Sequence, residues 1–99
     1  MIDLKKLQKD ILQNKIDKWF NTTDVNMEFN LIYGELAEAF ESHHKSLWKT
    51  WEELADVTIF ILWLSEMLWI NLEDEIIKKI AINKARKYKK SSWDWHVKM

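Results

Sequence analysis

The sequence predicts an all-α protein: a four-helix, bundle-type protomer in a single domain that spans residues 1–99. Proline is absent and glycine occurs once, which disfavours the many tight turns of β-sandwiches and barrels. Four segments place apolar residues at helical spacing, with short polar breaks between them. Apolar residues make up 47% of the chain and include seven tryptophans, more than a core of this size holds. We therefore expect a homodimer or homotetramer.

The first helix is expected over residues 3–20, where apolar side chains recur near one stripe. A polar run at residues 21–24, rich in helix-capping residues, separates it from the second helix. That helix is expected over residues 25–44. Gly34 lies inside it, at a cost of about 1 kcal/mol relative to alanine.

The third helix is expected to begin after Thr50, because Thr50 and Glu53 match a capping box. It continues to about residue 70 and is apolar nearly all round, which predicts a central helix or one shared with a partner. Asn71 is expected to cap the fourth helix, whose basic last turn lies near Lys90. The aromatic tail, residues 91–99, is expected to pack on another surface.

Charge is distributed unevenly along the chain. The formal net charge of −1 gives no reason to expect nucleic acid or an anionic membrane as a partner. Residues 28–56, however, hold seven acids and two lysines, and residues 78–99 hold eight lysines or arginines and one acid. This pattern suits a site that binds a cation and then a polyphosphate. The other interpretation is two solvated faces that attract each other.

The chain contains no cysteine, which excludes disulfides and thiolate metal sites. Its most apolar stretch, residues 57–70, is interrupted by Glu66 and is shorter than the ~20 apolar residues of a membrane span. The N-terminus alternates charged and apolar residues, unlike a signal peptide. We expect a cytoplasmic protein that does not enter a membrane.

Two pairs of acids have the spacing i, i+3: Glu35 with Glu38, and Glu53 with Asp56. Residues three apart share one helix face, so each pair offers two carboxylates to one point. If the two helices pack antiparallel, as their short connection predicts, all four carboxylates meet with no lysine nearby. Such a cluster is costly without a cation, and oxygen ligands select magnesium or manganese. The alternatives are a capping role alone for Glu53 and a solvated face for each pair.

Two runs carry a resemblance to a known family: GELAE at residues 34–38 and EELAD at residues 52–56. Together they resemble the ExxE…(E)ExxD signature of MazG-like nucleotide pyrophosphohydrolases. Further along, Lys79, Asn83 and Arg86 resemble the Lys-x3-Asn-x2-Arg pattern of that family's last helix. The resemblance covers roughly residues 7–88. It fails after Arg86, where the family often has an aromatic residue and a proline.

The resemblance implies magnesium-dependent hydrolysis of a nucleoside triphosphate to a monophosphate and pyrophosphate, with Mn2+ as a possible substitute. The metal ligands would be Glu35, Glu38, Glu53 and Asp56. The catalytic residues at the attacking water would be Glu52 and Glu53. Phosphate oxygens would be bound by Lys79, Asn83 and Arg86, whose i, i+4, i+7 spacing places them on one helix face. A solvated basic helix end is the other interpretation of these three residues.

Two other function classes remain open. A non-catalytic helical oligomerisation or interaction module explains the tryptophans and the apolar third helix, but not the acids beside them. A di-iron carboxylate bundle needs two Glu-x-x-His motifs. Residues 41–44 supply one, and the only histidine outside them is His96. Trp93 and Trp95 fit either stacking on a base or filling an oligomer interface.

Overall fold

The computed structural model describes residues 1–45, 47–89 and 97–98. Its elements in chain order are α1 (Leu4–Asp17), α2 (Val25–Lys45), α3 (Leu47–Met67), α4 (Leu72–Ala85), β1 (Tyr88–Lys89) and β2 (Val97–Lys98). The two short strands pair antiparallel, with Tyr88 opposite Lys98. The predicted all-α class is confirmed, since four helices build the protomer. Trp93 and Trp95 of the predicted tail lie outside the described residues.

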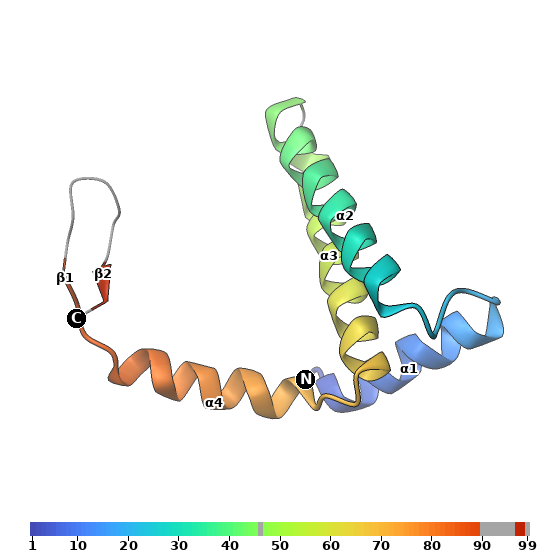
Figure 1. Cartoon of the computed structure of the whole chain (residues 1–99). Coiled ribbons are helices and arrows are strands. Elements are labelled where there is room, and N and C mark those ends of the chain that lie inside the picture. The colour runs from blue at the N-terminus through green and yellow to red at the C-terminus, as the bar shows by residue number, and fades with distance from the viewer. Residues whose placement is uncertain (46, 90–96, 99) are drawn as a thin grey trace.

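Helices α2 and α3 form an antiparallel hairpin, and α1 packs across the end of it where α3 finishes (Figure 1). The buried apolar residues of the described chain come from these two hairpin helices: Ala39, Val57, Leu62, Trp63 and Leu64. Four of the five belong to α3, because α3 packs against both α2 and α1. The prediction that the third helix is central is confirmed.

Polar and cationic contacts fix α1 against α3. Gln8 of α1 is 3% exposed, and its Nε2 donates to the carbonyl oxygen of Ile70 at 2.6 Å and to Glu66 Oε1 at 3.4 Å. One turn from the end of α1, the Lys15 Nζ lies 4.6 Å from the centre of the Trp63 ring. A cation over an aromatic face is attracted by the ring quadrupole. These contacts set the angle at which α1 leaves the hairpin.

Four predicted helix boundaries are wrong. Helix α1 ends at Asp17 instead of residue 20, and α3 ends at Met67 instead of residue 70. Helix α3 begins at Leu47, so Thr50 lies inside the helix instead of capping it. The connection from α2 is too short to leave a separate capping turn, because α2 ends at Lys45. Helix α4 ends at Ala85 instead of near Lys90, because Arg86 adopts an extended backbone that leads into β1. The predicted cap at Asn71 is confirmed, since its side chain accepts from the Asp74 backbone N–H at 3.2 Å.

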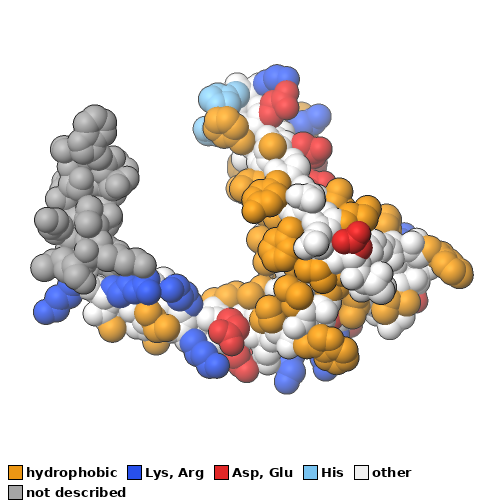
Figure 2. Space-filling view, in the orientation of Figure 1, with side chains coloured by type: hydrophobic (Ala, Val, Ile, Leu, Met, Phe, Trp, Pro, Cys, Tyr) orange, Lys and Arg blue, Asp and Glu red, His pale blue; other side chains and the backbone are white. Residues whose placement is uncertain are grey.

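Helix α4 extends away from the hairpin and packs beside the start of α1 (Figure 1). There the Leu4 N–H donates to Glu73 Oε1 at 3.2 Å. The radius of gyration is 16.4 Å, whereas a compact domain of this length has one of about 13 Å. Figure 2 shows hydrophobic side chains along the side of the hairpin that faces α4. The single protomer therefore leaves much of its apolar surface exposed.

Candidate metal centre

The carboxylates of α2 and α3 converge between the two helices. One carboxylate oxygen from each of Glu35, Glu38 and Glu53 lies within 4.8 Å of the other two. Glu35 and Glu53 are half-buried and Glu38 is exposed. The i, i+3 spacing on α2 and the antiparallel packing of α3 together produce this geometry. The structure thus brings together three of the four predicted metal ligands.

Small and buried residues beside the acids allow the two helices to approach. Ala39 follows Glu38 directly and is 3% exposed, and Val57 follows Asp56 and is 9% exposed. The acids therefore sit at the margin of the α2–α3 contact, one position away from its apolar core. A carboxylate held there is partly removed from water, which raises the cost of its charge.

The electrostatics of Glu35 reflect this position. Burial raises the pKa of Glu35 above its ordinary value of 4.5, and the negative charges of Glu38, Asp56 and Glu53 raise it further. Asp56 is exposed and lies outside the group of three, yet its charge acts on Glu35. Accumulated negative charge of this kind favours either a proton or a bound cation.

The remaining predicted site residues are not part of this cluster. Glu52 is exposed on α3, next to Glu53. On α4, Lys79 and Asn83 are exposed and Arg86 is half-buried. The Arg86 Nη1 donates to Asn83 Oδ1 at 3.4 Å. Because α4 extends away from the hairpin (Figure 1), these three side chains do not reach the acids of their own protomer.

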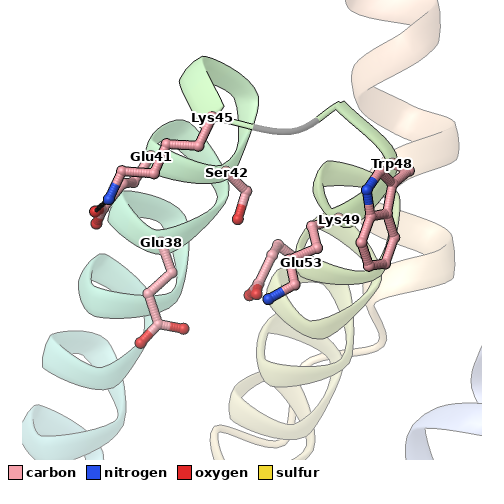
Figure 3. Close-up of a pocket in the computed structure, with 7 residues that line it drawn as sticks. All are labelled: Glu38, Glu41, Ser42, Lys45, Trp48, Lys49 and Glu53. Carbon is pink, nitrogen blue, oxygen red and sulfur yellow. Dashed lines mark hydrogen bonds and ion pairs between the residues drawn. The ribbon is translucent and has the colours of Figure 1, made fainter.

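A hollow of about 340 Å³ adjoins the acids at the closed end of the hairpin. Figure 3 shows Glu38 of α2 and Glu53 of α3 pointing into the space between the helices, with the Lys49 amine near the Glu53 carboxylate and the Lys45 amine turned toward Glu41. The residues that line the hollow are Glu38, Glu41, Ser42, Lys45, Trp48, Lys49 and Glu53.

The two lysines in this hollow correct one expectation, because basic groups do lie beside the carboxylates. Lys49 precedes Glu53 by four residues, and Lys45 forms an ion pair with Glu41. Sequence reasoning missed both lysines together with Ser42 and Trp48. The i, i+4 spacing of Lys49 and Glu53 was a signal for one of them, because it places both on one face of α3.

No histidine joins the carboxylate group within the part of the chain that the structure describes. His43 and His44 are exposed on the last turn of α2, and the ring of His44 contacts Phe40 edge-on at 4.6 Å. A di-iron centre built on Glu-x-x-His motifs does not fit this arrangement. Oxygen ligands alone favour a hard divalent cation.

Among the described residues, no helix has both the length and the apolar character needed to cross a membrane.

No protein-family model matches the sequence, and no curated protein matches it.

A solved structure does resemble the protein along its whole length. It is the MazG-like pyrophosphohydrolase of cyanophage S-2L, bound to dGDP and three catalytic Mn2+ ions per active site. The TM-score is 0.75 at 22% sequence identity, over 100% of this chain and 99% of the cyanophage chain. The chain therefore has the all-α fold of a MazG-like pyrophosphohydrolase.

Proposed function

We propose that this protein is a magnesium-dependent nucleoside triphosphate pyrophosphohydrolase, with Mn2+ as a possible substitute, that acts in the cytoplasm. The observation that carries the proposal is the convergence of Glu35, Glu38 and Glu53 within 4.8 Å on an antiparallel hairpin. Nucleotide and Mn2+ in the cyanophage protein of the same fold support this choice of substrate and metal class.

The donor set fits a divalent cation. Three carboxylates from two helices, with Asp56 as a fourth ligand, supply only oxygen atoms, which suits magnesium or manganese. The raised pKa of Glu35, caused first by burial and then by its acidic neighbours, marks an excess of negative charge that a cation relieves. A bound divalent ion would polarise phosphate oxygens and neutralise the charge that develops on them.

The reaction is the attack of a water oxygen on the α-phosphorus. A P–O bond to water forms, and the bond from the α-phosphorus to the bridging oxygen breaks with its electron pair leaving on pyrophosphate. Glu52 is assigned to accept the proton of the water, because it is exposed beside Glu53 and is not in the metal-binding group. Glu53 would hold the metal ion and position the water beside it. Positioning and charge neutralisation account for most catalysis of phosphoryl transfer.

The hollow beside the acids fits the leaving pyrophosphate. Lys49 brings a positive charge and Ser42 a hydroxyl to its wall, next to Glu38 and Glu53, whereas the charge of Lys45 is paired with Glu41. Lysine binds phosphate oxygens as a point charge. We assign to Lys49, which lies four residues before Glu53 on the same face of α3, the neutralisation of charge on the departing group.

We propose that one protomer supplies phosphate-binding residues to the acid cluster of a second copy of the chain. These residues are Lys79, Asn83 and Arg86. Lys79 and Asn83 lie one helical turn apart on α4, Arg86 follows directly after its end, and α4 extends away from its own acid cluster (Figure 1). Figure 2 shows basic side chains on the side of α4 that is turned toward the hairpin. The acidic residues 28–56 of one protomer and the basic residues 78–99 of another are complementary in charge. This arrangement fits the expected homodimer or homotetramer.

Pyrophosphate release from a panel of ribo- and deoxyribonucleoside triphosphates tests the function. With Mg2+ the wild-type protein should release pyrophosphate and form the nucleoside monophosphate as the second product. In EDTA the reaction should stop. Glu38→Gln should be inactive, because it removes a ligand charge and keeps the side-chain volume. The matched control Asp10→Asn alters an exposed acid of α1 and should keep full activity. Release by Glu38→Gln at the wild-type rate would show that the site is wrongly placed.

Coexpression of two inactive variants tests whether α4 of one protomer completes the acid site of another. Glu38→Gln and Arg86→Ala, each inactive alone, should together recover about a quarter of the wild-type rate, because half of randomly formed dimers carry one intact composite site of two. If α4 served its own cluster, the coexpressed pair would stay as inactive as the single variants.

A further inference from the structure

Helices α1 and α3 end in the same hydrogen-bonding motif. After α1, the Phe20 N–H donates to the Lys15 oxygen at 2.9 Å and the Trp19 N–H to the Ile16 oxygen at 3.1 Å. After α3, the Ile70 N–H donates to the Ser65 oxygen at 2.9 Å and the Trp69 N–H to the Glu66 oxygen at 3.1 Å. Each pair of bonds is a Schellman motif, in which the residue after the helix cap is left-handed and usually glycine.

Tryptophan occupies the left-handed position in both motifs. Trp19 has φ 62° and Trp69 has φ 60°, and they are the only non-glycine residues with positive φ that the described chain contains. A side chain with a Cβ costs free energy in this conformation, and glycine does not. Both residues are 95% exposed, so the protomer recovers none of this cost by burying an indole. The strained backbone at these two tryptophans is not offset by any burial of their indoles within the protomer. We therefore look for their role in a contact outside the protomer.

The two indoles flank one surface, which we name the Trp-cap surface. It consists of Leu12, Ile16, Asp17, Trp19, Phe20, Thr22, Glu66, Met67 and Trp69. Two hollows lie on it, one of about 490 Å³ beside Trp19 and one of about 290 Å³ beside Trp69. Ile16 and Thr22 line both hollows, so the hollows adjoin. The surface therefore presents projecting aromatic side chains and apolar recesses side by side.

We infer that the Trp-cap surface binds the Trp-cap surface of a second copy of this chain, each copy placing its indoles in the hollows of the other. A two-fold interface uses the same patch on both subunits, so the patch must carry both the projection and the recess. This patch carries both. Fully exposed tryptophans dominate interface energetics when they fill such recesses.

The available area agrees with a second copy as the occupant. Two tryptophans at 95% exposure offer about 400–500 Å², about half of the roughly 800 Å² that each partner buries in a stable interface. Ile16 at 49% and Phe20 at 52% exposure belong to the same surface and add to the total. Asp17 lines the hollow beside Trp19 and Glu66 lines the hollow beside Trp69. These two acids disfavour nucleic acid or an anionic membrane as the partner.

Sedimentation velocity of the full chain over a range of concentrations, without nucleotide, tests this inference. Trp19→Gly and Trp69→Gly should each raise the dissociation constant about 30-fold, and the double variant should lower the assembly to half the wild-type mass or less. Circular dichroism should stay unchanged. Because no hydrolysis is measured, the result is independent of the proposed enzymatic function.

A second comparison separates the lost interface from a damaged fold. Trp19→Ala removes the same indole but keeps a Cβ in the left-handed position, so it should dissociate like Trp19→Gly and show a lower denaturation midpoint. A wild-type mass distribution in the double variant would overturn the inference. So would a monomeric wild type that binds phosphatidylcholine vesicles through these tryptophans, because the surface would then face a membrane.

Discussion

Glu38→Gln should stabilise the metal-free fold while it removes the metal response. In the metal-free protein the charges of Glu35, Glu38 and Glu53 lie within 4.8 Å of one another. Two unit charges at that distance repel by about 0.9 kcal/mol in a water-like dielectric. Neutralising Glu38 removes two such repulsions, and screening at physiological salt, with a Debye length of about 8 Å, leaves a gain of about 1 kcal/mol.

Thermal denaturation followed by circular dichroism, at one fixed protein concentration, measures this gain. In EDTA the midpoint of Glu38→Gln should lie about 4–8 °C above that of the wild type. With millimolar Mg2+ the wild type should rise, because a ligand that binds only the folded state stabilises it by mass action. The variant should respond to Mg2+ far less.

Asp10→Asn, which removes an exposed charge of α1, is the control and should follow the wild type in both conditions. The reasoning would be refuted if Glu38→Gln were less stable than the wild type in EDTA. In that case the Glu38 carboxylate would make a favourable contact instead of repelling its neighbours. A full Mg2+ response in the variant would equally refute the assignment of Glu38 as a ligand.

Three further outcomes are expected. Gly34→Ala should raise the free energy of unfolding by about 1 kcal/mol, because an added Cβ meets no atom within 4 Å. A lower free energy of unfolding, measured by urea denaturation, would show that a partner or ligand approaches α2 there. Asn71→Ala should lower it by about 1 kcal/mol through the lost cap of α4, and an unchanged urea midpoint would contradict this. In EDTA, the free energy of unfolding should fall as the pH rises from 4.5 through the raised pKa of Glu35, because the folded state keeps that proton to a higher pH than the unfolded chain does. Glu35→Gln should flatten this fall in urea titrations between about pH 4 and 7. An equal slope in both proteins would count against the expectation.

The helices and the local order of the acids follow from short-range features of the sequence. Apolar periodicity and the absence of proline specify four helices, and the cap at Asn71 follows from its side chain and the acids after it. The i, i+3 spacing fixes that Glu35 and Glu38 share a face, because 3.6 residues make a turn in any α-helix. These features depend on neighbours in the chain, so they can be predicted without a structure.

Boundaries that depend on neighbouring elements were not predictable in this way. The capping box at Thr50 is a sound local signal, yet α3 begins earlier at Leu47 because the hairpin leaves no room for a separate cap. The end of α4 at Ala85 is followed by β1, which pairs with β2 further along the chain, so the backbone there follows strand pairing and not helical periodicity. A local preference is weak and yields to such tertiary contacts.

Which charged side chains meet depends on how the helices pack. Helical spacing assigns residues to faces, but the packing of one helix on another sets which faces come together. That packing joins Glu53 to Glu35 and Glu38, and places Lys49 in the adjoining hollow. It also carries α4, with Lys79 and Arg86, away from the acids of its own protomer. The left-handed backbone of Trp19 and Trp69 is likewise a product of how α1 and α3 end, because sequence preference alone would put glycine there.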